Sequence, residues 1–151
     1  DDALDALRTR LLPLASIVTP NIPEAELLLG YPIPDQAMAE SALAEFVDDL
    51  GARAVLPKGG HLPSADVVID RYRDGEHVAN FGHDRLDLDA HGTGCTLASA
   101  IAANLCLGLS MPEAARAASD YVGRALRLGY RPGRGDVVAL DHFGAAPPER
   151  R

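Results

Sequence analysis

The sequence has 151 residues, of which 47% are hydrophobic and 24% charged, a composition that suits one domain with its own core. Acidic residues outnumber basic ones by 22 to 14, and the net charge of -8 argues against a nucleic-acid or anionic membrane partner. Polar or helix-breaking residues interrupt every apolar run before the roughly 18 residues that a membrane-spanning helix needs. The acidic opening DDALDALRTR is unlike a secretory signal.

The two cysteines, Cys95 and Cys106, fall within one predicted helix. A rise of about 1.5 Å per residue would place them roughly 16 Å apart, which is beyond the reach of a disulfide. We therefore expect reduced thiols and a cytoplasmic protein.

The first part of the chain alternates between helical and extended patterns. Leucines recur at helical spacing in the opening segment until Pro13, and β-branched residues dominate ASIVTP. Gly30 and Gly51 each follow an amphipathic run and are typical helix ends. These patterns predict helices at residues 1–12, 21–30 and 35–50, and strands at residues 15–20 and 52–58.

The second part begins with a predicted β-hairpin, in which ADVVIDRYR and EHVANF flank the turn residues Asp74 and Gly75. RLDLDA reads as one more short strand. Residues 94–107 are apolar on nearly every side, which predicts a helix buried between layers. A last helix is predicted from Ser110 to about Leu128, with Glu113 completing a capping box.

Strands that alternate with helices predict an α/β fold with a mainly parallel sheet, to which the hairpin adds antiparallel strands at one side. In such sheets ligands bind beyond the carboxyl ends of the strands. Three segments directly follow predicted strands, namely residues 19–24, 58–61 and 91–95.

The HGTGCT segment, residues 91–96, combines two glycines with the start of a helix. Such a corner exposes backbone N–H groups at the positive end of the helix dipole, so it is suited to an anion. The thiolate of Cys95 would be favoured in the first helical turn. The alternative is an ordinary glycine loop in which Cys95 fills a small space, and these six residues alone do not decide between the two.

The TPNIPEAE segment holds Asn21 and Glu24 three residues apart. An amide and a carboxylate at this spacing suit Mg²⁺ that is held through waters. The same pair also forms a helix cap, with Asn21 at the N-cap and Glu24 at the third helical position, and caps are the commoner use of this pattern.

The LPKGGH segment could place the ammonium group of Lys58 beside phosphates, with the backbone of Gly59 and Gly60 close by. The order GxxxxGK[ST] occurs nowhere in the chain, so this is not a Walker loop. A plain turn after a strand is the alternative.

Other chemistries have weaker support. The five histidines form no HxxxH motif and there is no CxxC, which argues against a zinc site, and the usual dinucleotide motif GxGxxG is absent. His91 and Cys95 lie close in sequence, but this spacing does not establish a hydrolase pair. The aspartates of RLDLD fit the polar positions of a strand.

The order of these motifs is more specific than any one of them. TPNIPEAELLLG, VLPKGGH, DRYRDGE, HGTGCTLASAIAANL and SMPEAARAASDYV together resemble the C-terminal part of the ribokinase-like vitamin kinases, above all the hydroxymethylpyrimidine/phosphomethylpyrimidine kinases of thiamine biosynthesis. The resemblance runs from about Asp1 to at least Tyr130. It implies a three-layer α/β/α fold and ATP-dependent phosphorylation of 4-amino-5-hydroxymethyl-2-methylpyrimidine and of its monophosphate.

The resemblance also implies roles for single residues. The backbone of Gly92, Thr93, Gly94 and Cys95 would form an anion hole for the transferring phosphate, and Cys95 would be the base that accepts the substrate hydroxyl proton. Glu24 and Asn21 would organise Mg²⁺ and its waters. The ATP site would be formed by Lys58, near the phosphates, and by Gly59, Gly60, His61 and Leu62.

The resemblance starts in the middle of the fold, so the N-terminal part of the family's domain has no counterpart in this chain. It implies that residues 1–143 form the C-terminal nucleotide-binding portion, followed by a disordered tail at 144–151. A homodimer, or pairing with the missing N-terminal portion, is expected. A pyridoxal kinase of the same superfamily and a non-catalytic nucleotide-binding fragment are the alternatives, whereas hydroxyethylthiazole kinase fits less well.

Overall fold

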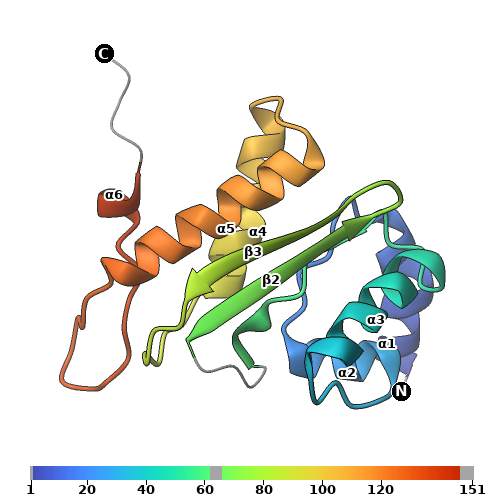
Figure 1. Ribbon diagram of the computed structural model, residues 1–151, viewed down its shortest axis with the longest axis horizontal. Helices are drawn as coiled ribbons and strands as arrows, with labels where there is room; N and C mark the ends of the chain where they lie inside the picture. Colours follow the sequence, from blue (N-terminus) through green and yellow to red (C-terminus); the bar gives the residue numbers. More distant parts are fainter. Residues whose placement is uncertain (1, 62–65, 147–151) are drawn as a thin grey trace. The chain divides into compact units, whose positions relative to one another are not determined.

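The computed structural model describes residues 2–61 and 66–146, and Figure 1 shows the course of the chain. The chain divides into two compact units, Asp1–Arg85 and Leu86–Arg151. In the described residues, no helix is both long enough and apolar enough to cross a bilayer.

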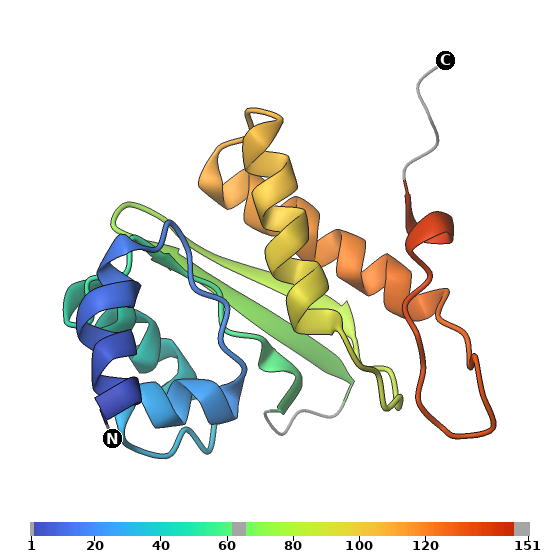
Figure 2. The same cartoon turned by 180° about the vertical axis from the view of Figure 1, so that it is seen from behind.

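The first unit combines helical segments with a small sheet. Its helices are α1 (Asp2–Ala6), the π-helix η1 (Leu7–Leu11), the short 3₁₀ helices η2 (Leu12–Leu14) and η3 (Gly59–His61), α2 (Ile22–Leu29) and α3 (Gln36–Asp48). Its strands are β1 (Ala54–Val55), β2 (Val67–Asp74) and β3 (Val78–Asp84). Figure 2 shows α1, α2 and α3 grouped beside the hairpin of β2 and β3.

The opening helix is less regular than the sequence predicts. Only α1 is α-helical, and the chain then widens into the π-helix η1 and tightens into the 3₁₀ helix η2 before Ala15. Pro13 sits at the start of η2, and because proline has no backbone N–H it cannot continue an α-helix. The segment still provides Leu12 to the core.

The core of the first unit is formed where α2 and α3 pack together beside the extended segments. The predicted apolar side of α3 is confirmed, since Ala39, Leu43 and Phe46 are buried, with Val47 and Leu50 packed against them. Gly30 ends α2 in the left-handed conformation at φ 86°, as the sequence predicts. The other buried members of the cluster are Leu12, Ile22, Ala25, Leu28, Ile33, Ala42 and Val55.

The named sheet has the order β1, β2, β3 and both pairings are antiparallel. The predicted hairpin is confirmed, with β2 and β3 paired from Val67 opposite Asp84 to Arg73 opposite Val78. The prediction of a mainly parallel sheet is not confirmed. In the described part of the first unit, parallel pairing consists of two isolated bridges, Val18 with Val55 and Asn21 with Lys58.

Proline explains why the parallel pairing stays short. The N–H of Val18 donates to Ala54 and that of Leu56 donates to Val18, at 3.0 and 2.8 Å. In this alternation the next donor would be residue 20, which is a proline without an N–H, and the bond is lost. The ladder resumes only with the N–H of Lys58, which donates to the Pro20 carbonyl at 3.1 Å.

A buried arginine joins the hairpin to α3. The side chain of Arg71 on β2 donates to the carbonyl of Ile69 and to the side-chain oxygen of Gln36, and it lies 3.7 Å from a carboxylate oxygen of Glu40. Arg71 is only 4% exposed, so these partners compensate for the burial of its charge.

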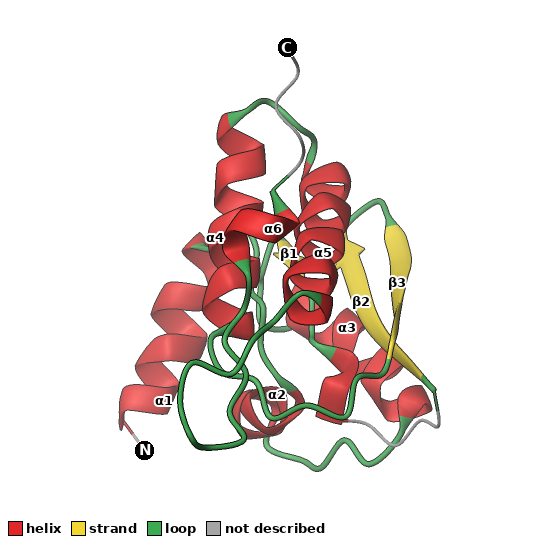
Figure 3. Cartoon of the chain, turned by 90° about the vertical axis from the view of Figure 1, so that its left-hand side faces the viewer, coloured by secondary structure: helices red, strands yellow, loops and turns green. Residues whose placement is uncertain are grey.

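The second unit consists of α4 (Thr93–Cys106), α5 (Met111–Arg127) and the four-residue α6 (His142–Ala145). Figure 3 shows α4 and α5 as neighbouring helices. The predicted capping box of α5 is confirmed, because Ser110 and Glu113 bond reciprocally. The predicted strand at RLDLDA is reduced to a parallel bridge between Ala90 and Val138.

The prediction that residues 94–107 form a helix buried between layers is not confirmed for α4. Only Leu97 and Ile101 are buried along this helix. Alanine is apolar but adds little surface, so a helix rich in alanine satisfies a hydrophobic pattern without needing a cover on every side. The last helix, α6, crosses the predicted domain end at residue 143, and its Ala145 is buried. Residues 147–151 of the predicted disordered tail lie outside the described residues.

The hairpin turn is closed by one carboxylate. Asp74 accepts hydrogen bonds from the backbone N–H groups of Glu76 and His77, at 2.7 and 2.6 Å, and from the hydroxyl of Tyr72. Burial opposes the ionisation of Asp74, but these hydrogen bonds outweigh it and lower its pKa to about 2. Burial and the bond to Asp74 together raise the pKa of the Tyr72 hydroxyl.

We expect the turn to make stability depend on pH. A carboxyl with a lowered pKa stabilises the fold above its unfolded value of about 4 and loses this contribution as the pH falls through about 2. Asp74→Asn should therefore cost on the order of 2 kcal/mol near neutral pH and much less near pH 2. Urea unfolding across this range measures it, with the exposed Asp84 of the same hairpin mutated to Asn as the control. An equal cost of Asp74→Asn at both ends of the range would contradict this account.

Candidate functional site

Two of the predicted motifs meet in the first unit. Asn21 forms a parallel bridge with Lys58, so the start of α2 and the end of the segment after β1 lie side by side. The sequence predicts that both follow strands, but it does not show that the strands are neighbours. The arrangement places Asn21 beside Lys58, with the carboxylate of Glu24 three residues after Asn21 in the first turn of α2.

Asn21 and Glu24 form the capping box that is the structural alternative to a metal site. The Asn21 side-chain oxygen accepts from the Glu24 N–H, and a Glu24 carboxylate oxygen accepts from the Asn21 N–H, both at 2.8 Å. The bond to Asn21 engages one of the two carboxylate oxygens, and Glu24 is exposed to solvent. Capping therefore holds the carboxylate in place without burying it.

The donor set is compatible with magnesium but not with a fully protein-bound metal. In the described residues there is no group of three or more histidine, cysteine, aspartate or glutamate side chains that could hold a metal ion. Mg²⁺ keeps most of its waters and typically takes one or two protein carboxylates together with substrate phosphates. The exposed Glu24, fixed beside Asn21, fits this mode of binding.

The loop after Lys58 is held against β2. The N–H of Gly59 donates to a carboxylate oxygen of Asp70 at 3.1 Å, and the carbonyl of Gly60 accepts from the Arg85 guanidinium at 3.1 Å. A Cβ on Gly59 would lie 2.0 Å from the Ile69 carbonyl oxygen, so only glycine fits there.

Two residues predicted for the nucleotide site are less fully defined. The backbone of His61 belongs to η3, and Leu62 lies outside the described residues.

The HGTGC segment starts α4 in the second unit. Gly92 is the N-cap in the left-handed conformation, at φ 86°, which glycine adopts without a steric cost. The first intrahelical bond runs from the Thr96 N–H to the Gly92 carbonyl at 2.9 Å. The N–H groups of Gly94 and Cys95 belong to the first turn, which precedes that bond and faces the helix N-terminus.

The structure decides one of the alternatives for Cys95. Cys95 and Cys106 are both free and exposed, as expected for thiols that cannot reach each other. The Cys95 side chain faces solvent, so it does not fill a small space among the described residues, whereas the glycine loop before the helix belongs to both interpretations. What remains is an accessible thiol in the first turn of a helix that begins with Gly92.

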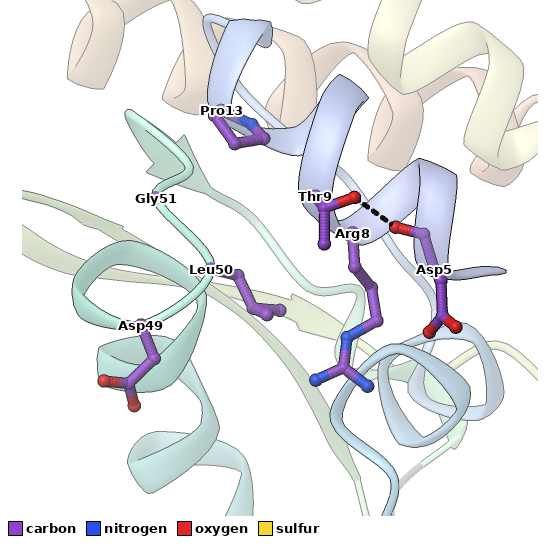
Figure 4. A pocket seen from close by; sticks show the side chains of 7 residues that line it. All are labelled: Asp5, Arg8, Thr9, Pro13, Asp49, Leu50 and Gly51. Carbon is purple, nitrogen blue, oxygen red and sulfur yellow. Dashed lines mark hydrogen bonds between the residues drawn. The ribbon is translucent and has the colours of Figure 1, made fainter.

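A pocket of about 560 Å³ in the first unit lies elsewhere. Figure 4 shows its lining, which is formed by Asp5, Arg8, Thr9, Pro13, Asp49, Leu50 and Gly51. Its charged side chains are two carboxylates and one guanidinium, an unfavourable balance for a nucleotide polyphosphate. The described residues that line it include none of the predicted site residues.

Asp70 and Arg85 contact the loop and were not found from the sequence. Asp70 lies within β2 and Arg85 directly follows β3, where polar residues are expected on a half-exposed strand. The only signal of their role in the sequence was a charged residue within an alternating pattern, at a position that the structure shows to be partly buried. Their role depends on the loop that lies beside β2, which local sequence does not reveal.

The two glycines of this loop should respond differently to alanine. Gly59→Ala drives a methyl group into the Ile69 carbonyl, and the required backbone shift should cost about 1–3 kcal/mol of stability. In the described residues nothing lies within 4 Å of a Cβ on Gly60, so Gly60→Ala should stay within about 0.5 kcal/mol of wild type. Urea unfolding of both variants checks this. Equal losses would show that the loop does not lie against β2.

Comparisons with known proteins agree on the relationship. The family model for phosphomethylpyrimidine kinase matches residues 1–139. The hydroxymethylpyrimidine/phosphomethylpyrimidine kinase of Streptomyces coelicolor is 43% identical over 141 residues, which are 93% of this chain and 51% of that protein. The thiamine biosynthesis bifunctional protein ThiED of Geobacter sulfurreducens is 48% identical over 149 residues, or 98% of this chain and 30% of that protein.

A solved structure gives the same picture of the fold. The pyridoxal kinase from Staphylococcus aureus in complex with AMP-PCP superposes with a TM-score of 0.86 at 33% sequence identity, over 95% of this chain and 52% of that one. The α/β fold is therefore that of the vitamin kinases. The chain spans about half the length of the curated single-function relatives that it matches. With its match over residues 1–139, the chain belongs to the phosphomethylpyrimidine kinase family.

Proposed function

We propose that this chain supplies the nucleotide-binding part of a kinase that transfers the γ-phosphate of ATP to 4-amino-5-hydroxymethyl-2-methylpyrimidine and then to its monophosphate. The observation that carries the proposal is the bridge between Asn21 and Lys58, which joins the two motifs suited to magnesium and phosphate. Membership of the family and the names of the curated relatives support the choice of acceptor.

Each group of the first unit has a role that its chemistry permits. The Lys58 ammonium would neutralise charge on the ATP phosphates, and Asn21 and Glu24 would hold hydrated Mg²⁺. Magnesium, when bound, lowers the charge on the β- and γ-phosphates. The wall of the nucleotide site would be formed by Gly59, Gly60, His61 and Leu62. The relative from Staphylococcus aureus, solved with an ATP analogue, supports ATP as the donor.

The second unit would hold the acceptor side of the reaction. The backbone of Gly92, Thr93, Gly94 and Cys95 would stabilise the charge on the transferring phosphate, because helix N-terminal N–H groups favour anions. The Cys95 thiolate would take the proton of the substrate hydroxyl while that oxygen bonds to phosphorus and ADP leaves. The exposure of Cys95 leaves its sulfur accessible to a substrate.

A second candidate function is phosphorylation of pyridoxal. The specific observation in its favour is the TM-score of 0.86 to the pyridoxal kinase from Staphylococcus aureus. The curated relatives named for the pyrimidine substrate have the higher sequence identities, 43% and 44% against 33%, and we therefore place the pyrimidine first. A nucleotide-binding fragment without catalysis is the third candidate, suggested by the coverage of about half a relative.

The proposal extends to the cellular location and the partners of the protein. Two free cysteines agree with a cytoplasmic location. A net charge of -8 disfavours nucleic acid as a partner. We propose that the active form is a homodimer, or that this chain pairs with the N-terminal portion that its relatives possess.

Cys95 should be required for phosphate transfer, and Cys106 should not. Removal of a general base typically costs a factor of about 10²–10⁴, so Cys95→Ala should reduce turnover by that amount. Cys106→Ala changes a thiol that is also exposed, at the other end of α4, and should leave turnover unchanged. The assay follows ADP release with the pyrimidine and with pyridoxal as acceptors.

This assay should be run on the 151-residue chain alone and on the same chain joined to the N-terminal half of the Streptomyces coelicolor relative. Turnover that Cys95→Ala leaves intact would remove Cys95 as the base. Faster turnover with pyridoxal than with the pyrimidine would favour the second candidate. If both forms bind nucleotide but neither shows turnover, the third candidate, a nucleotide-binding fragment without catalysis, would be supported.

The two capping boxes found among the described residues allow a structural role of Glu24 to be distinguished from a role in magnesium binding. Glu24→Gln and Glu113→Gln both keep an oxygen that can accept the cap bond, so each should change stability by less than about 1 kcal/mol. Only Glu24→Gln should weaken Mg²⁺-dependent ATP binding, by roughly 10-fold, because it removes a charge that faces the ion. Calorimetric titrations with and without Mg²⁺ measure this. Equal binding by both variants would leave Glu24 as a cap and nothing more.

A further inference from the structure

The backbone that follows Lys58 is held from two sides by the hairpin. Gly59 and Gly60 lie in η3, which packs beside the first half of β2 (Figure 1). On one side the Gly59 N–H donates to Asp70 of β2 at 3.1 Å. On the other side the Gly60 carbonyl accepts from the Arg85 guanidinium at 3.1 Å. One donor and one acceptor of consecutive residues are therefore each bound by a charged side chain.

Both of these side chains are themselves fixed. The Arg85 N–H donates to the Asp66 carbonyl at 2.8 Å, which continues the hairpin ladder beyond β3. Asp70 is opposite Phe81 in the register of β2 and β3, so His83 lies two residues along on the same face. The His83 ring nitrogen is 3.7 Å from the second Asp70 oxygen, and these side chains are only 16% and 13% exposed.

The hydrogen bond of Gly59 also limits what this loop can offer a ligand. Since the Gly59 N–H points to Asp70, it is not directed at a phosphate in this conformation. A glycine-rich loop that cradles phosphates does so with its backbone N–H groups. Here the glycine at position 59 instead allows close packing on Ile69, and Lys58 is left as the cationic group of the motif.

We propose that Asp70 and Arg85 are positioning residues that clamp the Gly59–Gly60 backbone, with His83 supporting Asp70, and so aim the Lys58 ammonium at the phosphates of the bound nucleotide. This inference rests on the proposed function, and it assigns parts to three hairpin residues outside the predicted motifs. Neither positioning residue touches the reacting atoms. Their effect is on the geometry of the residue before the glycines, because the backbone after Lys58 is fixed at two consecutive residues, through the N–H of Gly59 and the carbonyl of Gly60.

The test uses the 151-residue chain with Asp70→Ala, Asp70→Asn, Arg85→Ala and Arg85→Lys. Asn keeps an oxygen that can accept from Gly59, and Lys keeps a donor for Gly60, so these two variants should recover most of what the alanine variants lose. The control is Asp84→Asn, which changes an exposed carboxylate between His83 and Arg85 in the sequence. Urea unfolding identifies any variant whose overall stability has changed.

Two readouts are measured on every variant. Amide hydrogen exchange of Gly59 should accelerate roughly 10- to 100-fold in Asp70→Ala, since a hydrogen bond to a charged group is lost. The dissociation constant for AMP-PCP with Mg²⁺ should rise about 10-fold in both alanine variants and return towards wild type in Asp70→Asn and Arg85→Lys. Asp84→Asn should change neither quantity.

The outcomes distinguish the clamp from the proposed function. Unchanged Gly59 exchange in Asp70→Ala would overturn the clamp, as would nucleotide affinities that are the same in the alanine variants and the wild type. If the wild-type chain binds no nucleotide, the proposed function and the aiming of Lys58 both fail. In that case faster Gly59 exchange in Asp70→Ala would still establish the clamp as a structural device.

Discussion

The arrangement of the first unit depends on three backbone hydrogen bonds between extended segments that are far apart in the sequence. They join Val18 to Ala54, Leu56 to Val18 and Lys58 to Pro20. Because the segments run parallel, their carboxyl ends finish together, which brings Asn21 beside Lys58. A shift of this register would move Asn21, and with it the start of α2, away from Lys58, and the candidate site would not exist.

The pairing of these extended segments also explains why the same capping motif can have a purely structural role at one position and a proposed ligand-binding role at another. The described part of the chain contains two proline-containing helix starts with reciprocal caps, Asn21 with Glu24 and Ser110 with Glu113. The hydrogen bonds within each are alike, and each satisfies backbone N–H groups that the helix leaves open. Only the first lies next to Lys58. A capping box therefore fixes the direction of a carboxylate. Whether that carboxylate can also bind a ligand depends on the residues that lie next to the capping box in the tertiary structure.

Predictions from the sequence succeeded where the cause was local and failed where it was not. The hairpin, the caps and the apolar side of α3 depend on residues a few positions apart, and all were confirmed. The mainly parallel sheet was not confirmed, since Pro20 removes a donor from the parallel ladder while the hairpin pairs along seven residue pairs. The prediction of a buried α4 was not confirmed, because a hydrophobic pattern shows which residues are apolar and does not show how many other elements pack against the helix.

The sequence by itself determined the chemical groups of this protein, the glycines that its tight corners require, and the resemblance that membership of the kinase family later confirmed. These features follow from residue identity and short spacing. Only the tertiary structure decided that Asn21 meets Lys58, that Cys95 is exposed, and that Asp70 and Arg85 hold the glycine loop. Each of these depends on which strands become neighbours, and that outcome is set by burial and backbone pairing over the whole unit.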